Sequence, residues 1–171
     1  MSLEPLLNAS PVIQIHAAFA ILALVLGAVQ LIRITKGDWL HKLMGRTWVV
    51  LMAVVAGSSF FIWTIRLWWL FSPIHLISIF TLVMLWRGWT FARKGDVRNH
   101  SRTMEYLYFL ALVVTGLLTF ISGRIMYQVA FGPDGATPAK LEVFGGIVVA
   151  LALATVGILV WKHGRRAVAR G

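Results

Sequence analysis

The chain has 171 residues, of which 59% are hydrophobic and 13% are charged, and it contains no cysteine. So apolar a composition excludes an ordinary soluble domain, and the lack of cysteine excludes disulfides, iron–sulfur clusters and thiolate metal sites. The formal net charge of +10 does not indicate nucleic acid as a partner, because Lys and Arg stand in short segments beside apolar runs, where they signal membrane topology.

Five runs without a charged residue follow one another, and each is close to the ~20 residues that a helix needs to cross ~30 Å of hydrocarbon. They cover residues 5–32, 47–65, 67–86, 106–123 and 143–161. The first run is preceded by the acidic Glu4 and by no basic segment, which argues against a cleaved signal peptide. The pattern predicts an all-α membrane protein with five transmembrane helices, the third of which begins at Ser72-Pro73.

Positive charges alternate between the ends of these runs. Most Lys and Arg residues fall in three segments that share one side of the membrane: Arg33, Lys36, Lys42 and Arg46; Arg87, Arg93, Lys94, Arg98 and Arg102; and Lys162, Arg165, Arg166 and Arg170. Arg66, Arg124 and Lys140 fall on the opposite side. The positive-inside rule predicts an N-terminus outside and a C-terminus in the cytoplasm, in a bacterial inner membrane.

The first four runs contain an internal repeat. Ile-His occurs at 15–16 and at 74–75, and each copy is followed by an apolar stretch, a Lys-Gly-Asp turn and a second histidine, 25 residues after the first. The tripeptides, at 36–38 and 94–96, are offset by 58 residues and the histidines by 59. We predict two repeated hairpins, about 11–66 and 72–124. Residues 1–131 then form a four-helix transmembrane bundle, and 132–171 an outer loop, a fifth transmembrane helix and a basic cytoplasmic tail.

Two hairpins repeated in the same orientation are expected to be related by a pseudo-two-fold axis along the membrane normal. That axis pairs His16 with His75 near the outer surface and His41 with His100 near the inner surface. The sequence therefore predicts two symmetric sites of two histidines each, and ionisable residues within a membrane usually mark function.

Two neutral imidazoles without a nearby thiolate or carboxylate suit the axial positions of a haem iron better than a tetrahedral zinc site. We therefore expect two haem b groups, with His16 and His75 on one iron and His41 and His100 on the other. Their propionates need cations, and the basic residues near each pair are Arg46, Arg98 and Arg102 for the inner site and Arg66 and Arg124 for the outer site. Trp48, Tyr106, Tyr108 and Phe19 are candidates to line the macrocycles.

Each feature also has an ordinary explanation. His16, Ala20, Ala23, Gly27 and Gln30 share one helix face, yet small residues often serve only to let transmembrane helices pack closely. Either inner histidine alone is as well explained by contact with water or lipid head groups. The arginines are also topology anchors.

Three functions stay open at this point. The first is transmembrane electron transfer through two bis-histidine haems, as a cytochrome b-like component of a membrane oxidoreductase. The second is a non-catalytic accessory or assembly subunit that binds lipid, quinone or a partner protein without haem, and the third is a proton-coupled transporter. No Asp or Glu in the spans could orient a histidine as a general base, so a hydrolase is not expected. The bilayer is the expected environment, and a redox partner protein or an oligomer is compatible with any of the three.

Several strings are similar to a known family: His-Lys-Leu-Met-Gly-Arg at 41–46, Phe-Ser-Pro-Ile-His-Leu at 71–76, Ala-Arg-Lys-Gly-Asp at 92–96 and Gly-Arg-Ile-Met at 123–126. They resemble the bacterial predicted membrane proteins called domain of unknown function 2306, over roughly 10–131, with the fifth helix outside. The resemblance implies a compact multi-helix membrane protein and transfers no activity. The matching positions include His41, His75, His100 and Arg124, and His16 is consistent with the resemblance. The paired histidines are also similar in arrangement to small di-haem b-type cytochromes of bacterial membranes.

Overall fold

A computed structural model describes residues 2–62, 73–120 and 124–132, together with positions 135, 137, 138, 142 and 146. Within these residues the chain is built from helices and the turns between them, which confirms the all-α prediction. Arg66 and all but one residue of the predicted fifth helix lie outside the described part.

Three helices are long and apolar enough to cross a membrane: α2 (Pro11–Ile32), α3 (Trp39–Ser59) and α4 (Pro73–Arg93), the last counted from His75. The prediction that the third helix begins at Ser72-Pro73 is confirmed by the start of α4. Helix α3 begins eight residues before the apolar run that predicted it, because the basic residues Lys42 and Arg46 lie within its first turns. Long basic side chains can sit near a helix end while their charges reach the interface.

The fourth predicted span belongs to a longer helical column over residues 97–118. It consists of α5 (Val97–Tyr106), the π-helix η1 (Leu107–Val114) and α6 (Thr115–Leu118). A π-helix bonds each N–H to the carbonyl five residues earlier, widens the helix locally and is often found at functional sites. The changes of helix type divide the apolar run among the last residue of α5, η1 and α6, so no single helix there has the length of a membrane span.

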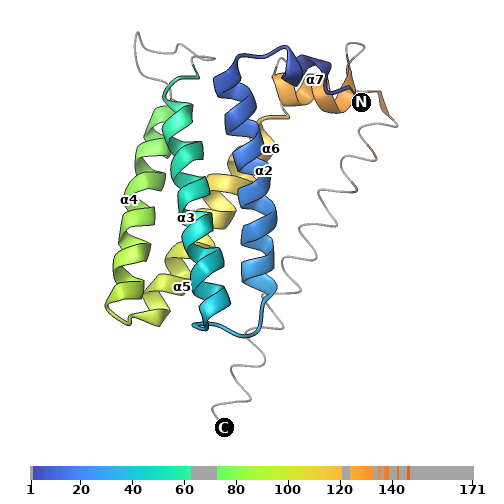
Figure 1. Ribbon diagram of the computed structural model, residues 1–171. Coiled ribbons are helices and arrows are strands. Elements are labelled where there is room, and N and C mark those ends of the chain that lie inside the picture. The colour runs from blue at the N-terminus through green and yellow to red at the C-terminus, as the bar shows by residue number, and fades with distance from the viewer. Residues whose placement is uncertain are drawn as a thin grey trace.

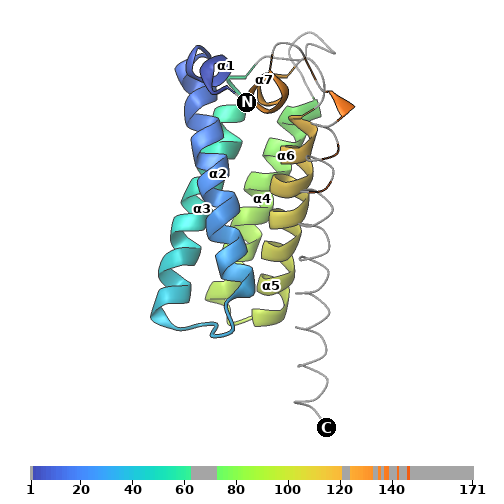
Figure 2. The same cartoon turned by 90° about the vertical axis from the view of Figure 1, so that its right-hand side faces the viewer.

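The three long helices and the 97–118 column lie side by side (Figures 1 and 2). Helix α2 contacts α3, α3 contacts α4, α4 contacts α5 and η1, and η1 contacts α2 again. This closed circuit places α2 diagonally opposite α4, and α3 diagonally opposite the column. A two-fold axis between repeated hairpins requires the same diagonal pairs, although the duplication itself stays a prediction.

Aromatic side chains fill the middle of this arrangement. The indole Nε1 of Trp48 donates to the carbonyl of Ala23 at 2.9 Å, and the hydroxyl of Tyr108 donates to the carbonyl of Leu24 at 3.3 Å. Gly27 lies one turn along α2, where a Cβ atom would come within 2.5 Å of Tyr108 Cδ2. The small residues at 23 and 27 therefore receive the two aromatic rings, as the close-packing explanation of this helix face requires.

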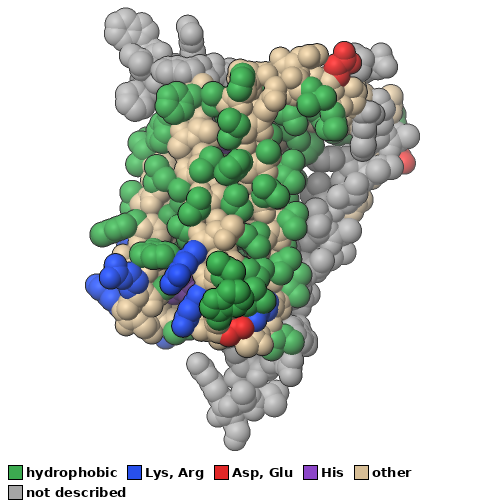
Figure 3. Space-filling view, viewed as in Figure 1, with side chains coloured by type: hydrophobic (Ala, Val, Ile, Leu, Met, Phe, Trp, Pro, Cys, Tyr) green, Lys and Arg blue, Asp and Glu red, His purple; other side chains and the backbone are tan. Residues whose placement is uncertain are grey.

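The flanks of the helices are apolar. Large hydrophobic side chains are exposed along α2 and α4, among them Ile21, Leu22, Val25, Leu76 and Phe80. Figure 3 shows this hydrophobic surface above a group of Lys and Arg side chains near the turn between α4 and α5. Exposed apolar flanks with a basic end are typical of helices whose solvent is lipid.

Both Lys-Gly-Asp segments form turns of the same design at one end of the helices, here called the turn end. Gly37 has φ +82° and Gly95 has φ +74°, a conformation that favours glycine. The following aspartates cap the next helices: Asp38 Oδ1 accepts from the N–H of His41 at 3.0 Å, and Asp96 Oδ1 accepts from the N–H of Asn99 at 3.1 Å. The predicted tight turns are confirmed.

Two short helices that the sequence did not predict lie at the opposite end, here called the α7 end. Helix α1 (Glu4–Leu7) contacts α7 (Ile125–Phe131), the N–H of Ser2 donates to the carbonyl of Val129, and Phe131 is buried. They lie across the ends of the long helices rather than along them (Figure 1). The N-terminal segment and the segment after Arg124 thereby close this end together.

The close approach at Gly27 makes a prediction about stability. The substitution Gly27→Ala should lower the free energy of unfolding by about 1–3 kcal/mol, because its Cβ would lie 2.5 Å from Tyr108 and 2.7 Å from Trp48, whose rings are fixed by hydrogen bonds. Gly57→Ala is the matched control, since a Cβ there meets nothing within 4 Å. Thermal unfolding of both variants in detergent measures the difference, and a G27A protein as stable as G57A would contradict the packing.

The cap at Asp96 predicts a pH dependence. The N–H and side-chain amide of Asn99 donate to this carboxylate and hold the pKa of Asp96 below its ordinary value. Its stabilising contribution is therefore complete above the unfolded pKa of about 3.9 and is lost as the pH falls through the lower folded pKa. Asp96→Ala should melt at a lower temperature than the native protein at neutral pH, and the gap should close in acid. A gap that stays constant with pH would contradict this.

Candidate functional site

The four histidines predicted as ligands lie in two polar clusters separated by the aromatic core. The turn-end cluster consists of Gln30, Arg33, Asp38, His41 and His100. The α7-end cluster consists of His16, Ser58, Ser59, His75 and Ser78. Each cluster contains one predicted pair, and the two clusters differ in how the pair is arranged.

At the turn end the structure brings His41 and His100 together. His41 is the third residue of α3 and His100 the fourth residue of α5, and each follows a capped turn. Their ring centroids are 6.5 Å apart and their planes are nearly perpendicular, at 89°. The pair thus spans a diagonal between helices that the contact circuit places opposite each other.

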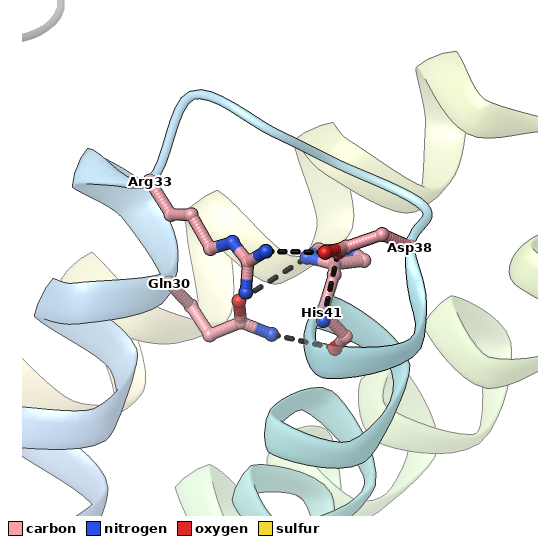
Figure 4. Close-up of polar contacts among 4 residues, drawn as sticks. All are labelled: Gln30, Arg33, Asp38 and His41. Carbon is pink, nitrogen blue, oxygen red and sulfur yellow. Dashed lines mark hydrogen bonds and ion pairs between the residues drawn. The ribbon is translucent and has the colours of Figure 1, made fainter.

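The ring of His41 is held by α2. Its Nδ1 lies 3.2 Å from Gln30 Oε1, while Gln30 Nε2 donates to the carbonyl of His41 at 2.9 Å (Figure 4). An amide oxygen only accepts, so Nδ1 carries the proton and donates. The Nε2 atom of His41 is left with a lone pair.

The ring of His100 has the same protonation, set by a backbone group. Its Nδ1 lies 2.9 Å from the carbonyl oxygen of Gly88, which can only accept. Side chains of α5 pack directly on Gly88, because a Cβ there would lie 1.9 Å from Met104 Cε and 3.2 Å from Thr103 Cγ2. As in His41, Nε2 of His100 has the lone pair.

Arg33 is a cation of this cluster that the charge pattern indicated only as a topology signal. Its guanidinium pairs with Asp38 through Nη2 and Oδ2, and its side chain is 20% exposed. Arg46, Arg98 and Arg102, which were predicted to serve the inner site, are exposed. The roles of Gln30 and Asp38 as partners of His41 were also missed. The position of Asp38, three residues before His41, could have indicated a helix cap, whereas Gln30 lies on another helix, 11 residues before His41.

At the α7 end His16 hydrogen bonds to α3. Its Nδ1 lies 2.9 Å from Ser58 Oγ, and that hydroxyl donates its own proton to the carbonyl of Val55 at 3.1 Å. The hydroxyl oxygen must therefore accept from the imidazole, so His16 is protonated on Nδ1. Three histidines of the predicted set share this tautomer.

His75 is buried, with 6% of its surface exposed, and stacks on Phe60 at 5.6 Å with an interplanar angle of 15°. Below it, the hydroxyls of Ser59 and Ser78 hydrogen bond to each other, and both residues are buried. The end of α3 is thus enclosed by polar side chains of α2 and α4.

His16 and His75 contact the end of α3 at different residues. His16 hydrogen bonds to Ser58 within the helix, whereas His75 stacks on Phe60, the residue that follows its last turn. That the two rings face each other stays a prediction. Arg124, predicted to serve the same site, lies at the N-cap of α7, at this end of the helices.

Among the described residues, no three His, Asp or Glu side chains come together as a metal site. The turn-end pair offers only two ligands, which suits a metal that brings its other ligands with it. A porphyrin iron is such a metal, because four of its positions are filled by the macrocycle.

The long apolar helices and their basic turn end define a helical membrane protein. The match to a family model agrees: the chain belongs to the family described as predicted membrane protein, domain of unknown function 2306 (DUF2306), over residues 13–158. The resemblance expected from the sequence is confirmed, but the expectation that the fifth helix lies outside it was wrong, because the match includes most of residues 143–161. No curated protein and no solved structure matches the chain.

The hydrogen bond between His16 and Ser58 can be tested through stability. His16→Ala and Ser58→Ala should show a coupling free energy of about 0.5–1.5 kcal/mol in a double-mutant cycle, because the pair joins α2 to α3 at 2.9 Å. Thr47→Val is the control partner for His16→Ala, since Thr47 bonds within its own helix. A coupling free energy equal to that of the control pair would contradict a stabilising hydrogen bond between His16 and Ser58.

Proposed function

We propose that this protein is a transmembrane electron-transfer protein that binds haem b between His41 and His100. The proposal includes a bundle of four membrane-spanning helices with a fifth beside it, in a bacterial inner membrane. It also includes the orientation that places the turn end and the C-terminus in the cytoplasm.

The geometry of the turn-end pair is the observation that carries this proposal. Two imidazoles on one metal, with a metal–nitrogen bond of about 2.1 Å and a ring radius of about 1.2 Å, have centroids about 6.5 Å apart. The rings of His41 and His100 have this spacing. Both are donors through Nδ1, which leaves Nε2 of each for a metal, the usual arrangement when a second group orients a ligating histidine.

Other residues supply what a haem at this place needs. Gln30 and Gly88 orient the two imidazoles, and the core of Trp48, Met52 and Tyr108 excludes water on the membrane side. Arg33 and the exposed Arg46, Arg98 and Arg102 offer cations to propionates at the interface. When bound, the haem supplies the iron that gains and loses one electron.

A second haem held by His16 and His75 remains part of the proposal on a narrower basis. It is supported by the repeat and by the Nδ1 tautomer of His16. Because the ring spacing of His41 and His100 suits two axial ligands, we expect the turn-end site to bind haem more tightly. Arg66 and Arg124 are the proposed cations for this second site.

A protein of another class is the alternative: an accessory subunit that binds lipid, quinone or a partner protein without haem. The α7-end cluster favours it, since His16 and His75 there contact protein groups that explain them as structural residues. No contact among the described residues favours the third candidate, a proton-coupled transporter.

An absorption spectrum tests the proposal. Protein purified from haem-replete cells should show a Soret band, with sharpened α and β bands after reduction by dithionite. His41→Ala and His100→Ala should each remove the turn-end haem, because one imidazole cannot fill both axial positions. His163→Ala, at a histidine that neither proposed site includes, is the control.

A colourless native protein would overturn the haem proposal and favour the accessory role. Equal haem content in H41A, H100A and H163A would leave a cytochrome but move its site away from this pair. Zinc, copper and iron analysis of a colourless sample would show whether the imidazoles bind a bare metal instead.

A further inference from the structure

The side chain of Gln30 makes two hydrogen bonds to one residue of the neighbouring helix. Its Nε2 donates to the carbonyl of His41 at 2.9 Å, and its Oε1 lies 3.2 Å from His41 Nδ1. The first bond fixes the orientation of the amide, because only the NH2 group can donate to a carbonyl. The oxygen is then presented to the ring, and the ring must donate through Nδ1 (Figure 4).

The surroundings restrain Gln30 and His41 together. Asp38 accepts from the backbone N–H of His41 and is itself paired with Arg33. Lys36 donates to the backbone carbonyl of Gln30. The amide lies beside Gly45, one turn after His41, where a Cβ would be in ordinary van der Waals contact with Gln30 Nε2, at 3.4 Å. The backbone N–H of His41 is thus held by Asp38, and its carbonyl and its ring are held by Gln30.

His100 provides an independent parallel. Its Nδ1 donates to the carbonyl of Gly88, a residue of the helix that precedes it in its own hairpin. Gln30 precedes His41 by 11 residues and Gly88 precedes His100 by 12. The two hairpins therefore place an acceptor against the same ring nitrogen, by a side chain in one and a backbone carbonyl in the other.

We infer that Gln30 is a positioning residue of the turn-end site: it fixes the Nδ1–H tautomer of His41 and so keeps the Nε2 lone pair available to a metal shared with His100. The metal-binding part of this role rests on the proposed haem site. The tautomer of His41, in contrast, is a property of the protein without any ligand. Partners of this kind typically change metal affinity by 10- to 100-fold when removed.

The first test uses haem-free protein. Nitrogen-15 NMR of labelled histidine in detergent distinguishes the two neutral tautomers, and His41 should be protonated on Nδ1. Gln30→Leu should shift it towards the Nε2–H form, because no acceptor is left for Nδ1. Gln30→Glu should restore the native tautomer, since a carboxylate also accepts from Nδ1–H.

Gln14→Leu is the matched control. Gln14 lies in the same helix and bonds only backbone carbonyls, those of Leu7 and Ala9, among the contacts of the described chain. Its substitution should leave His41 unchanged. Native protein with His41 protonated on Nε2 would overturn the inference without any variant, so the test does not depend on Q30L folding.

The second test measures haem affinity. Q30L should bind haem about 10- to 100-fold more weakly than native protein or Q14L, and Q30E should recover most of the loss. A tautomer that responds to Q30L in a protein that binds no haem would support the positioning and overturn the proposed function. Haem binding that is unaffected by Q30L would overturn the positioning role and leave the proposed function standing.

Discussion

The structure depends on one constraint of the bilayer, namely that polar groups within it must find partners inside the protein. The indole of Trp48 and the hydroxyl of Tyr108 each donate to a backbone carbonyl of α2. Both aromatic side chains thereby enter the core without leaving a polar atom unpaired, and they join α2 to α3 and to η1. The glycine at 27 makes room for them. The same constraint applies to His16, His41 and His100, and it explains why their Nδ1 atoms meet acceptors.

The two capped turns position the histidines of the turn-end cluster on these packed helices. Each turn needs a glycine with positive φ to reverse the chain and an aspartate to start the next helix. The aspartate cap fixes the residue at which each helix begins. It therefore also fixes where the histidine lies on the helix, three residues after Asp38 in one case and four residues after Asp96 in the other. His41 and His100 are therefore placed by local sequence before any contact between them forms. The contacts among the helices then place α3, which carries His41, diagonally opposite α5, which carries His100.

The features that could be predicted from the sequence are those that depend on neighbouring residues, namely apolar helices and tight turns. Three apolar runs became the long helices α2, α3 and α4, and both Lys-Gly-Asp segments became turns. Helix ends were predicted poorly, because charge-free runs exclude the basic first turns of α3 and all of α5 except its last residue. The division of the 97–118 column by a π-helix could not be foreseen either. Its apolar residues at 107–114 have no pattern that distinguishes an α-helix from a π-helix.

The two histidine pairs show the same division between local and tertiary information. Symmetry in the sequence predicted both pairs alike. The structure brings the rings of His41 and His100 to 6.5 Å, while the facing of His16 and His75 stays a prediction. Rotation of a helix by one residue redirects a side chain by about 100°. The repeat contains such a slip, as the tripeptides are offset by 58 residues and the histidines by 59. At the turn end the slip is absorbed: Gly88, which is 58 residues after Gln30, supplies its backbone carbonyl where Gln30 supplies a side chain. A glycine has no side chain, so at this position only the backbone carbonyl can accept a hydrogen bond. In spite of the register change, both imidazoles therefore donate through Nδ1 and keep the lone pair on Nε2.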